Sequence, residues 1–127
     1  MVRITSEPID PAKVYELISA QGAGSVLFHF AIVKPQKGSA GGTTSYIEYG
    51  TQGDAEAELQ AIADELAATY TLVDTLLIRR TGRLGLGDII SLAAASSPNS
   101  KDAFEACQHG ISRLRKMKTI VKNEVCG

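Results

Sequence analysis

The segment from Asp54 to Tyr70 constrains the fold most, because it has the pattern of an amphipathic helix between two segments of strand type. Its apolar residues recur at helical spacing: Leu59, Ile62, Ala63, Leu66 and Tyr70. Acidic side chains occupy the opposite face. Strands are predicted on both sides of this helix, at 44–49 and 73–80, so helices and strands alternate along the chain.

The remaining strands are predicted where apolar, β-branched or aromatic residues run together. These segments are 2–5, 25–33 and 89–95, with a short final strand at 119–125. Glycine-rich stretches separate some of the strands and predict a loop at 34–44 and a turn at 81–88.

Two further helices are predicted from their capping residues. Asp10 and Pro11 are suited to begin the first helix. Its apolar stripe is Val14, Leu17 and Ile18. Asn99 is suited to cap the last helix, with Asp102 as the acid of a capping box.

The predicted element order is β-α-β-β-α-β-β-α-β. Hairpin neighbours mixed with helices favour an α+β domain with three helices. The 127 residues suit one domain spanning 1–127. The strands at 73–80 and 89–95 are too apolar for the surface of a small monomer, which predicts a homodimer.

Charge and composition exclude several classes of protein. Thirteen basic and fourteen acidic residues give a net charge of -1, which argues against a general nucleic-acid-binding protein. Two cysteines, Cys107 and Cys126, are too few for a disulfide framework. They could form a single bridge, but reduced thiols are the simpler interpretation. No apolar run approaches the ~20 residues of a membrane span, and the first ten residues lack the pattern of a signal peptide. These features predict a cytoplasmic protein without membrane contact.

No metal site or nucleotide site is predicted. His29 and His109 have no cysteine or histidine at ligand spacing. The glycines at 82, 85 and 87 are followed by a strand rather than a helix, which disfavours a dinucleotide site. His29 and Cys107 both lie in apolar segments, and we interpret them as core residues.

Five basic residues and no acidic residue occupy positions 113–122. Such a run can be the solvated end of a helix, because cations favour helix C-termini. It can also form an anion site together with Lys34 and Lys37 of the glycine-rich loop, if the fold brings these segments together. The spacing of the residues leaves both interpretations open.

Several motifs follow one another in the second half of the chain. They are Thr81–Leu84, Gly87–Asp88, Ser96–Pro98, Ala103–Cys107 (AFEAC) and Lys122–Glu124. In this order they resemble the large, catalytic subunit of molybdopterin synthase, the MoaE family. The strand at 2–5 and the residues 47–49 before the acidic helix fit the same order, so the resemblance covers almost the whole chain.

This resemblance implies an α/β hammerhead fold with a mixed or antiparallel sheet, and a homodimer. It implies that each subunit binds a small ubiquitin-like sulfur carrier (MoaD-like), whose C-terminal Gly-Gly thiocarboxylate enters a pocket lined by lysine and arginine. Two sulfur atoms then pass to cyclic pyranopterin monophosphate, a step of molybdenum cofactor biosynthesis. The chain is thus expected to be a sulfurtransferase without a cofactor of its own. The alternative is a diverged member that acts as a dimeric scaffold for the carrier or an anion.

The resemblance also implies a set of substrate-binding residues. They are Ile32, Val33, Lys34, Asn99, Ser100, Arg115, Lys122, Asn123 and Glu124. Asn99 and Ser100 stand where the family has a histidine and an arginine, and we expect a second copy of the chain to contribute them to the pocket.

The catalytic residues implied by the resemblance lie near the end of the chain. Lys122 is expected to be the main catalytic amine, with Arg115 or Lys116 holding the tail or assisting. Arg115 stands where the family has a lysine. Lys34, which replaces an arginine of the family, is expected to bind phosphate.

Overall fold

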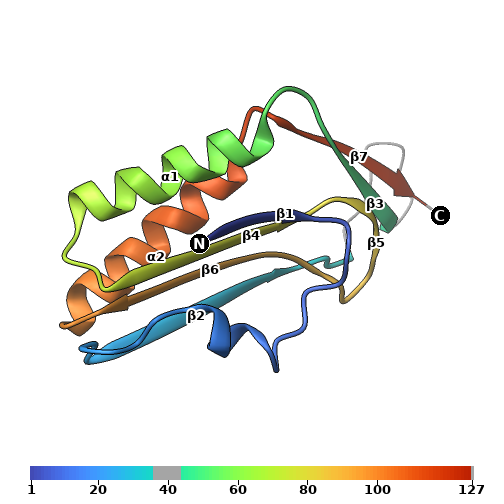
Figure 1. The fold of residues 1–127 in the computed structure, drawn as a ribbon. Coiled ribbons are helices and arrows are strands. Elements are labelled where there is room, and N and C mark those ends of the chain that lie inside the picture. Colours follow the sequence, from blue (N-terminus) through green and yellow to red (C-terminus); the bar gives the residue numbers. More distant parts are fainter. Residues whose placement is uncertain (36–43, 127) are drawn as a thin grey trace.

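The computed structural model describes residues 1–35 and 44–126, which form two β-sheets and two α-helices (Figure 1). The larger sheet has the strand order β1-β4-β6-β2, with bounds Val2–Thr5, Asp74–Arg80, Ile89–Ser97 and Ser25–Ile32. The smaller sheet has the order β5-β3-β7, with bounds Gly82–Gly85, Thr44–Thr51 and Ile120–Cys126. The helices are α1 (Ala55–Thr69) and α2 (Ser100–Arg115), and η1 (Val14–Leu17) is a short 3-10 helix.

The larger sheet is mixed, because β1 runs parallel to β4 while β6 is antiparallel to both β4 and β2. The smaller sheet is antiparallel throughout. Figure 1 shows α1 and α2 side by side on one face of the larger sheet, with the smaller sheet at one end. The predicted α+β class is therefore confirmed, and most predicted strands lie within two residues of the observed ones.

The prediction of three helices is wrong, because the segment after Asp10 forms only the short helix η1. Asp10 does act as a cap, since its Oδ1 accepts a hydrogen bond from the Ala12 N–H at 2.9 Å. A longer helix would need the backbone N–H and carbonyl of Ser19 for its own hydrogen bonds. In the structure both groups bond to distant residues instead. The Ser19 N–H donates to Asp74 Oδ2 at 2.8 Å, and the Ser19 carbonyl accepts from Ser96 Oγ at 2.6 Å.

The stretch 81–88, predicted as a turn, contains the short strand β5. This strand pairs with β3, and its Leu84 is fully buried. Only the following residues turn, with Gly87 at φ +87°, a conformation that glycine adopts without strain. The partner strand lies far away in the sequence, so the local glycine content alone suggested a loop.

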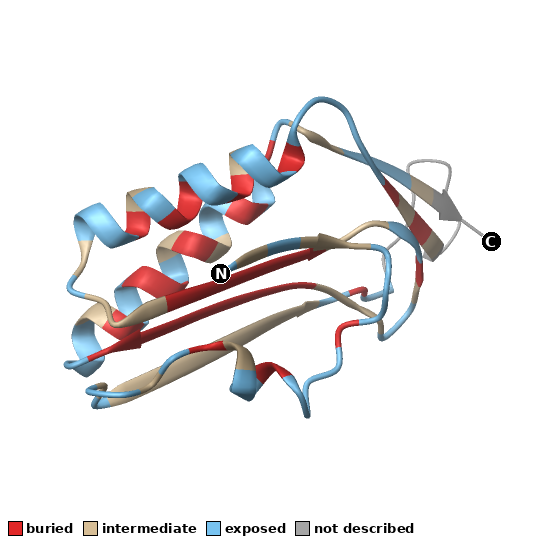
Figure 2. Ribbon diagram, viewed as in Figure 1, coloured by how far each residue is buried: buried red, intermediate tan, exposed pale blue. Residues whose placement is uncertain are grey.

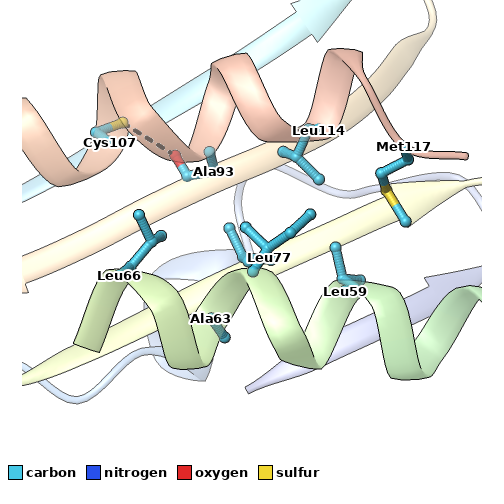
Figure 3. Packing of buried hydrophobic residues seen from close by; sticks show 9 residues of the cluster. Leu59, Ala63, Leu66, Leu77, Ala93, Cys107, Leu114 and Met117 are labelled. Atoms are coloured by element: carbon cyan, nitrogen blue, oxygen red, sulfur yellow. Dashed lines mark hydrogen bonds between the residues drawn. The ribbon is translucent and has the colours of Figure 1, made fainter. Parts of the chain in front are cut away.

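The main hydrophobic core lies between the two helices and one face of the larger sheet (Figure 3). Side chains alternate along β4, so Leu77 joins this core while Leu76 and Ile78 face the opposite side. On that side they pack against Val14 and Ile18 of the N-terminal segment. Figure 2 shows the result, with β4 and β6 buried along most of their length.

This burial corrects the reasoning that predicted a homodimer from the strands at 73–80 and 89–95. β4 and β6 lie in the middle of the larger sheet and are covered on both faces within one chain. They need no second copy to remove them from water. The homodimer therefore remains a prediction that rests on the family resemblance.

Helix α2 begins as predicted, with Asn99 as its N-cap. The Asn99 Oδ1 accepts a hydrogen bond from the Asp102 N–H at 2.8 Å. Asp102 does not complete the predicted capping box, because the Asn99 N–H donates to Ser97 Oγ at 3.2 Å. The Asp102 carboxylate accepts instead from the Thr71 N–H at 2.9 Å, which ties the start of α2 to the turn between α1 and β4.

Strand β2 connects the larger sheet to the smaller one. Its pairing with β6 shifts between Ala31 and Ile32, where the strand becomes irregular. Val33 then bonds to the turn after β5: its N–H donates to the Asp88 carbonyl at 3.0 Å, and its carbonyl accepts from the Gly87 N–H at 2.9 Å. Val33 is buried against residues of β3 and β5, so the two sheets share a small core of their own.

Candidate functional site

A pocket of about 590 Å³ lies where the end of α2 meets the junction of the two sheets. Its volume falls in the range of small-molecule binding sites. The lining comes from both sheets, from α2 and from the residues after it: residues 29–34, Ile47, Tyr49, Arg79, Ile90, Ser91, Ile111, Leu114, Arg115, Met117, Ile120 and Lys122. A smaller cavity of about 130 Å³ lies beside η1.

Four cationic side chains line the large pocket, from four separate segments of the chain. They are Lys34, Arg79, Arg115 and Lys122. Among the residues that the structure describes, no aspartate or glutamate lines the same pocket. Concentrated positive charge in a hollow attracts anions. The pocket is therefore a candidate site for a phosphate or a carboxylate group.

Lys122 extends from β7 next to Tyr49, which is its direct partner in the register of β3 and β7. Residues two apart in a strand share a face, so Glu124 lies beside Lys122. The Lys122 Nζ is 3.9 Å from Glu124 Oε2, and 48% of the Lys122 side chain is exposed. An exposed ion pair contributes little to stability, so the ammonium group can turn toward a bound ligand at small cost.

Arg79 is the most enclosed of the four cations, with 8% of its surface exposed. Its guanidinium carbon lies 4.4 Å from the centre of the Tyr49 ring. Its Nε has no hydrogen-bond partner among the described residues. Burial lowers the pKa of Arg79, and the neighbouring Tyr49 offsets part of that effect. The pKa of a guanidinium starts so high that Arg79 remains charged at neutral pH.

Arg115 is the last residue of α2 and lines the pocket, whereas its neighbour Lys116 does not. With 3.6 residues per turn, successive side chains of a helix point about 100° apart. The backbone stays wound at this point, because the Lys116 N–H donates to the Arg113 carbonyl at 3.1 Å. Lys116 and Lys118 are both exposed to solvent, outside the pocket lining.

The structure brings together five of the residues that the family resemblance implied for substrate binding: Ile32, Val33, Lys34, Arg115 and Lys122. Asn99 and Ser100 lie at the opposite end of α2 from Arg115. The helix has 16 residues, so its two ends are roughly 24 Å apart. Asn99 and Ser100 are therefore outside the pocket of their own chain, and their contribution from a second copy stays a prediction.

Two other predicted substrate-binding residues lie apart from the lining. Asn123 and Glu124 follow Lys122 in β7 without lining the pocket, although Glu124 contacts Lys122. Lys37 of the glycine-rich loop lies outside the described residues.

Sequence reasoning missed Arg79, Tyr49 and His29 as pocket residues. His29 was expected in the core, and it is instead half-buried on β2 at the pocket wall. For Arg79 a signal was present, because it stands two positions after Leu77 in an apolar strand and so falls on the same, buried face. A charge on a buried face needs a partner or a ligand. Tyr49 carries no comparable signal.

Two absences hold for the described part of the chain. Its residues include no group of three or more side chains that could hold a metal ion. None of the helices described there is long and apolar enough to cross a membrane.

The fold and the site together define an α+β protein with a cationic pocket at the junction of its two sheets. Comparison with known families agrees with this class, since the family described as MoaE protein matches residues 4–117. The chain belongs to the MoaE family of molybdopterin synthase catalytic subunits.

Individual relatives extend this result along nearly the whole chain. The molybdopterin synthase catalytic subunit of Staphylococcus aureus (strain COL) is 32% identical over 123 residues, covering 96% of this chain and 82% of the relative. That of Thermoplasma volcanium is 25% identical over 124 residues, covering 98% and 90%.

Comparison with solved structures also finds molybdopterin synthases. The crystal structure of molybdopterin synthase from Staphylococcus aureus matches with a TM-score of 0.88 and 30% identity, covering 98% of this chain and 90% of that chain. A complex of subunits 1 and 2 of molybdopterin-converting factor from Helicobacter pylori 26695 matches with a TM-score of 0.76. That match has 16% identity and covers 98% of this chain and 84% of that chain, so it shows likeness of fold alone.

Proposed function

We propose that this chain transfers sulfur from a small carrier protein to a pterin, as the catalytic subunit of a molybdopterin synthase in molybdenum cofactor biosynthesis. The carrier is a ubiquitin-like (MoaD-like) subunit with a thiocarboxylate on its C-terminal Gly-Gly tail. The acceptor is cyclic pyranopterin monophosphate. The observation that carries the proposal is the convergence of Lys34, Arg115 and Lys122 on one pocket. Membership of the MoaE family supports the same activity.

The charge of the pocket suits both reactants. A thiocarboxylate and a phosphate are anions, and ammonium and guanidinium groups are their usual protein ligands. A Gly-Gly tail carries no side chains, so its backbone can approach the reacting groups closely. One cationic pocket can therefore hold the sulfur donor next to its acceptor.

We assign Lys122 the role of catalytic amine. Its ammonium can donate a proton to the carbonyl oxygen of the carrier tail or to the pterin intermediate, and the resulting amine can accept a proton later. Glu124, with an oxygen 3.9 Å from Lys122 Nζ, helps to orient that group. Arg115 presents a planar guanidinium fork, which suits it to hold an anionic group. Lys34 binds phosphate. The assisting role of Lys116 stays a prediction, and its place outside the lining favours Arg115 for holding the tail.

The functional assembly in this proposal is a homodimer. Asn99 and Ser100 lie too far from Arg115 to reach the pocket of their own chain. A second copy that places the start of its α2 against the pocket contributes both side chains.

A single-turnover assay with thiocarboxylated carrier and cyclic pyranopterin monophosphate tests this function. The dithiolene product is expected to form at a rate that depends on this chain. The same carrier with an ordinary carboxylate at its tail serves as the control and yields no product. If the carrier binds but no sulfur is transferred, the chain is a scaffold and the proposal is wrong.

A further inference from the structure

We infer that Arg79 binds an oxyanion of the reactants inside the pocket, with its guanidinium held in place by the Tyr49 ring. The inference rests on the proposed function, which supplies the two candidate oxyanions. One is the phosphate of the pterin, and the other is the carboxylate-type end of the carrier tail. The residues implied by the family resemblance do not include Arg79.

Arg79 is a buried charge without a carboxylate beside it. It is 8% exposed, and its Nε–H has no acceptor among the described residues. None of the ion pairs in that part of the chain involves Arg79. Charged side chains are rarely buried unless they are paired, because leaving water costs free energy. An anionic ligand in the pocket supplies the missing partner.

A second arginine, Arg83, also stacks on a tyrosine ring, but unlike Arg79 it has a carboxylate partner. The guanidinium carbon of Arg83 lies 4.0 Å from the centre of the Tyr46 ring. Its Nη2 is also 3.2 Å from Glu48 Oε1, and 65% of the Arg83 side chain is exposed. Arg79 stacks on Tyr49 in a similar way but is buried and faces the pocket. The Tyr49 ring fixes the guanidinium of Arg79. A bound anion can then take the position beside Arg79 that the Glu48 carboxylate takes beside Arg83.

The position of Arg79 complements that of Lys122. Both cations adjoin Tyr49, because Arg79 lies over its ring and Lys122 is its partner across β3 and β7. A guanidinium presents a rigid planar fork that can donate two hydrogen bonds to one oxyanion. An ammonium can additionally give up a proton. Arg79 is therefore suited to fix the ligand, while Lys122 remains available for proton transfer.

Isothermal titration calorimetry with two simple anions tests this inference without carrier or turnover. The probes are inorganic phosphate and N-acetyl-glycylglycine, which ends in a carboxylate. Arg79→Gln is expected to weaken binding of at least one probe roughly 10- to 100-fold, the effect of losing hydrogen bonds to a charged group. Arg83→Gln is the matched control, because it removes the same charge from an exposed arginine outside the lining, and it should leave binding nearly unchanged.

Protein stability gives a second readout. Removing a buried charge that has no carboxylate partner relieves a cost of folding. This gain offsets the loss of the contact with Tyr49, so Arg79→Gln should unfold at about the same temperature as the wild type or higher. A residue that served only to hold the fold together would lower the unfolding temperature when replaced. If Arg79→Gln fails to fold, Arg79→Lys keeps the charge but removes the planar fork, and it should weaken binding several-fold.

The outcomes separate this inference from the proposed function. Weaker phosphate binding assigns Arg79 to the pterin phosphate, and weaker peptide binding assigns it to the carrier tail. Equal affinities in wild type and Arg79→Gln, or equal losses in Arg79→Gln and Arg83→Gln, overturn the inference. So does a wild-type protein that binds neither probe. Absence of sulfur transfer together with anion binding that depends on Arg79 contradicts the proposed function alone.

Discussion

Burial determines the chemistry of Cys107. The side chain lies in the core between α2 and the larger sheet, as Figure 3 shows, and its Sγ is 3.4 Å from the Ala93 carbonyl oxygen. Burial raises the pKa of the Cys107 thiol to about 11. The thiolate is the reactive form of cysteine, so this thiol is inert at neutral pH. The prediction that Cys107 is a core residue is confirmed.

Replacing Cys107 should therefore affect stability and not sulfur transfer. Cys107→Ala removes one buried atom that packs in the core, which is expected to lower the free energy of unfolding by about 1 kcal/mol. Denaturant unfolding measures this change, and the single-turnover assay measures transfer. A variant that stays folded but loses transfer would mean that the thiol takes part in the chemistry.

Glu58 connects helix α1 to the segment between α2 and β7. Its two carboxylate oxygens accept three hydrogen bonds: from the Lys118 N–H at 2.9 Å, the Thr119 N–H at 2.9 Å and the Thr119 hydroxyl at 2.6 Å. Burial alone would raise the pKa of Glu58, but these bonds outweigh it and the pKa is lowered from 4.5. The contact fixes the residues that lead from Arg115 to Lys122, and so it supports one wall of the pocket.

We expect Glu58→Gln to lower the free energy of unfolding by about 1–2 kcal/mol at neutral pH, because hydrogen bonds to a carboxylate are lost. A carboxyl group whose pKa is lowered by folding stabilises the protein above its unfolded pKa, and this stabilisation disappears as the pH falls through the folded value. The difference between wild type and variant should therefore shrink below about pH 4.

Glu56→Gln is the control for this measurement, because Glu56 lies in the same first turn of α1 but is exposed. Urea unfolding at several pH values compares the three proteins. A Glu58→Gln effect that is the same at pH 3 and pH 7 would show that the carboxylate charge does not stabilise the contact.

Local sequence patterns predicted most elements of this fold. They failed where tertiary contacts determine the secondary structure. Helix α1 follows from its apolar periodicity, and the start of α2 follows from Asn99 as its N-cap. The segment after Asp10 has similar signals, but its helix ends early where Ser19 donates a hydrogen bond to Asp74 and accepts one from Ser96. The glycine-rich sequence of β5 is typical of a turn, and the segment is a strand because it pairs with β3.

The candidate site was predicted only in part for the same reason. Lys34, Arg115 and Lys122 were found because they occupy positions of known motifs. Arg79 belongs to no such motif. That it lines the pocket is known only from the position of β4 in the folded chain. Its burial beside Tyr49 depends on how the two sheets meet, which no local pattern contains.

The pocket exists only in the complete fold, because its walls come from β2, β3, β4, β6, β7 and the end of α2. Each segment is fixed by a different contact. Val33 bonds to the turn after β5, and Glu58 fixes the turn before β7. Changes that loosen the junction of the two sheets should therefore affect ligand binding even when they lie outside the lining.

At the level of assembly we predict a homodimer with a mass near twice 13.5 kDa. Phe104 is 62% exposed, and it lies one turn from Asn99 and Ser100, which the dimer is expected to bring to the partner's pocket. A large exposed apolar side chain at this place is suited to an interface. Light scattering at micromolar concentration measures the mass, and a monomer alone would contradict the prediction.

The central claim is that Lys122 carries sulfur transfer from within the basic pocket, and the single-turnover rate of Lys122→Ala tests it most directly. Loss of a positioned acid–base group is expected to slow transfer by ~10²-fold or more. Lys118→Ala is the matched control, because Lys118 belongs to the same basic run but is exposed outside the pocket lining. We predict that Lys122→Ala loses transfer while Lys118→Ala keeps it. Equal rates in wild type and Lys122→Ala would contradict the account.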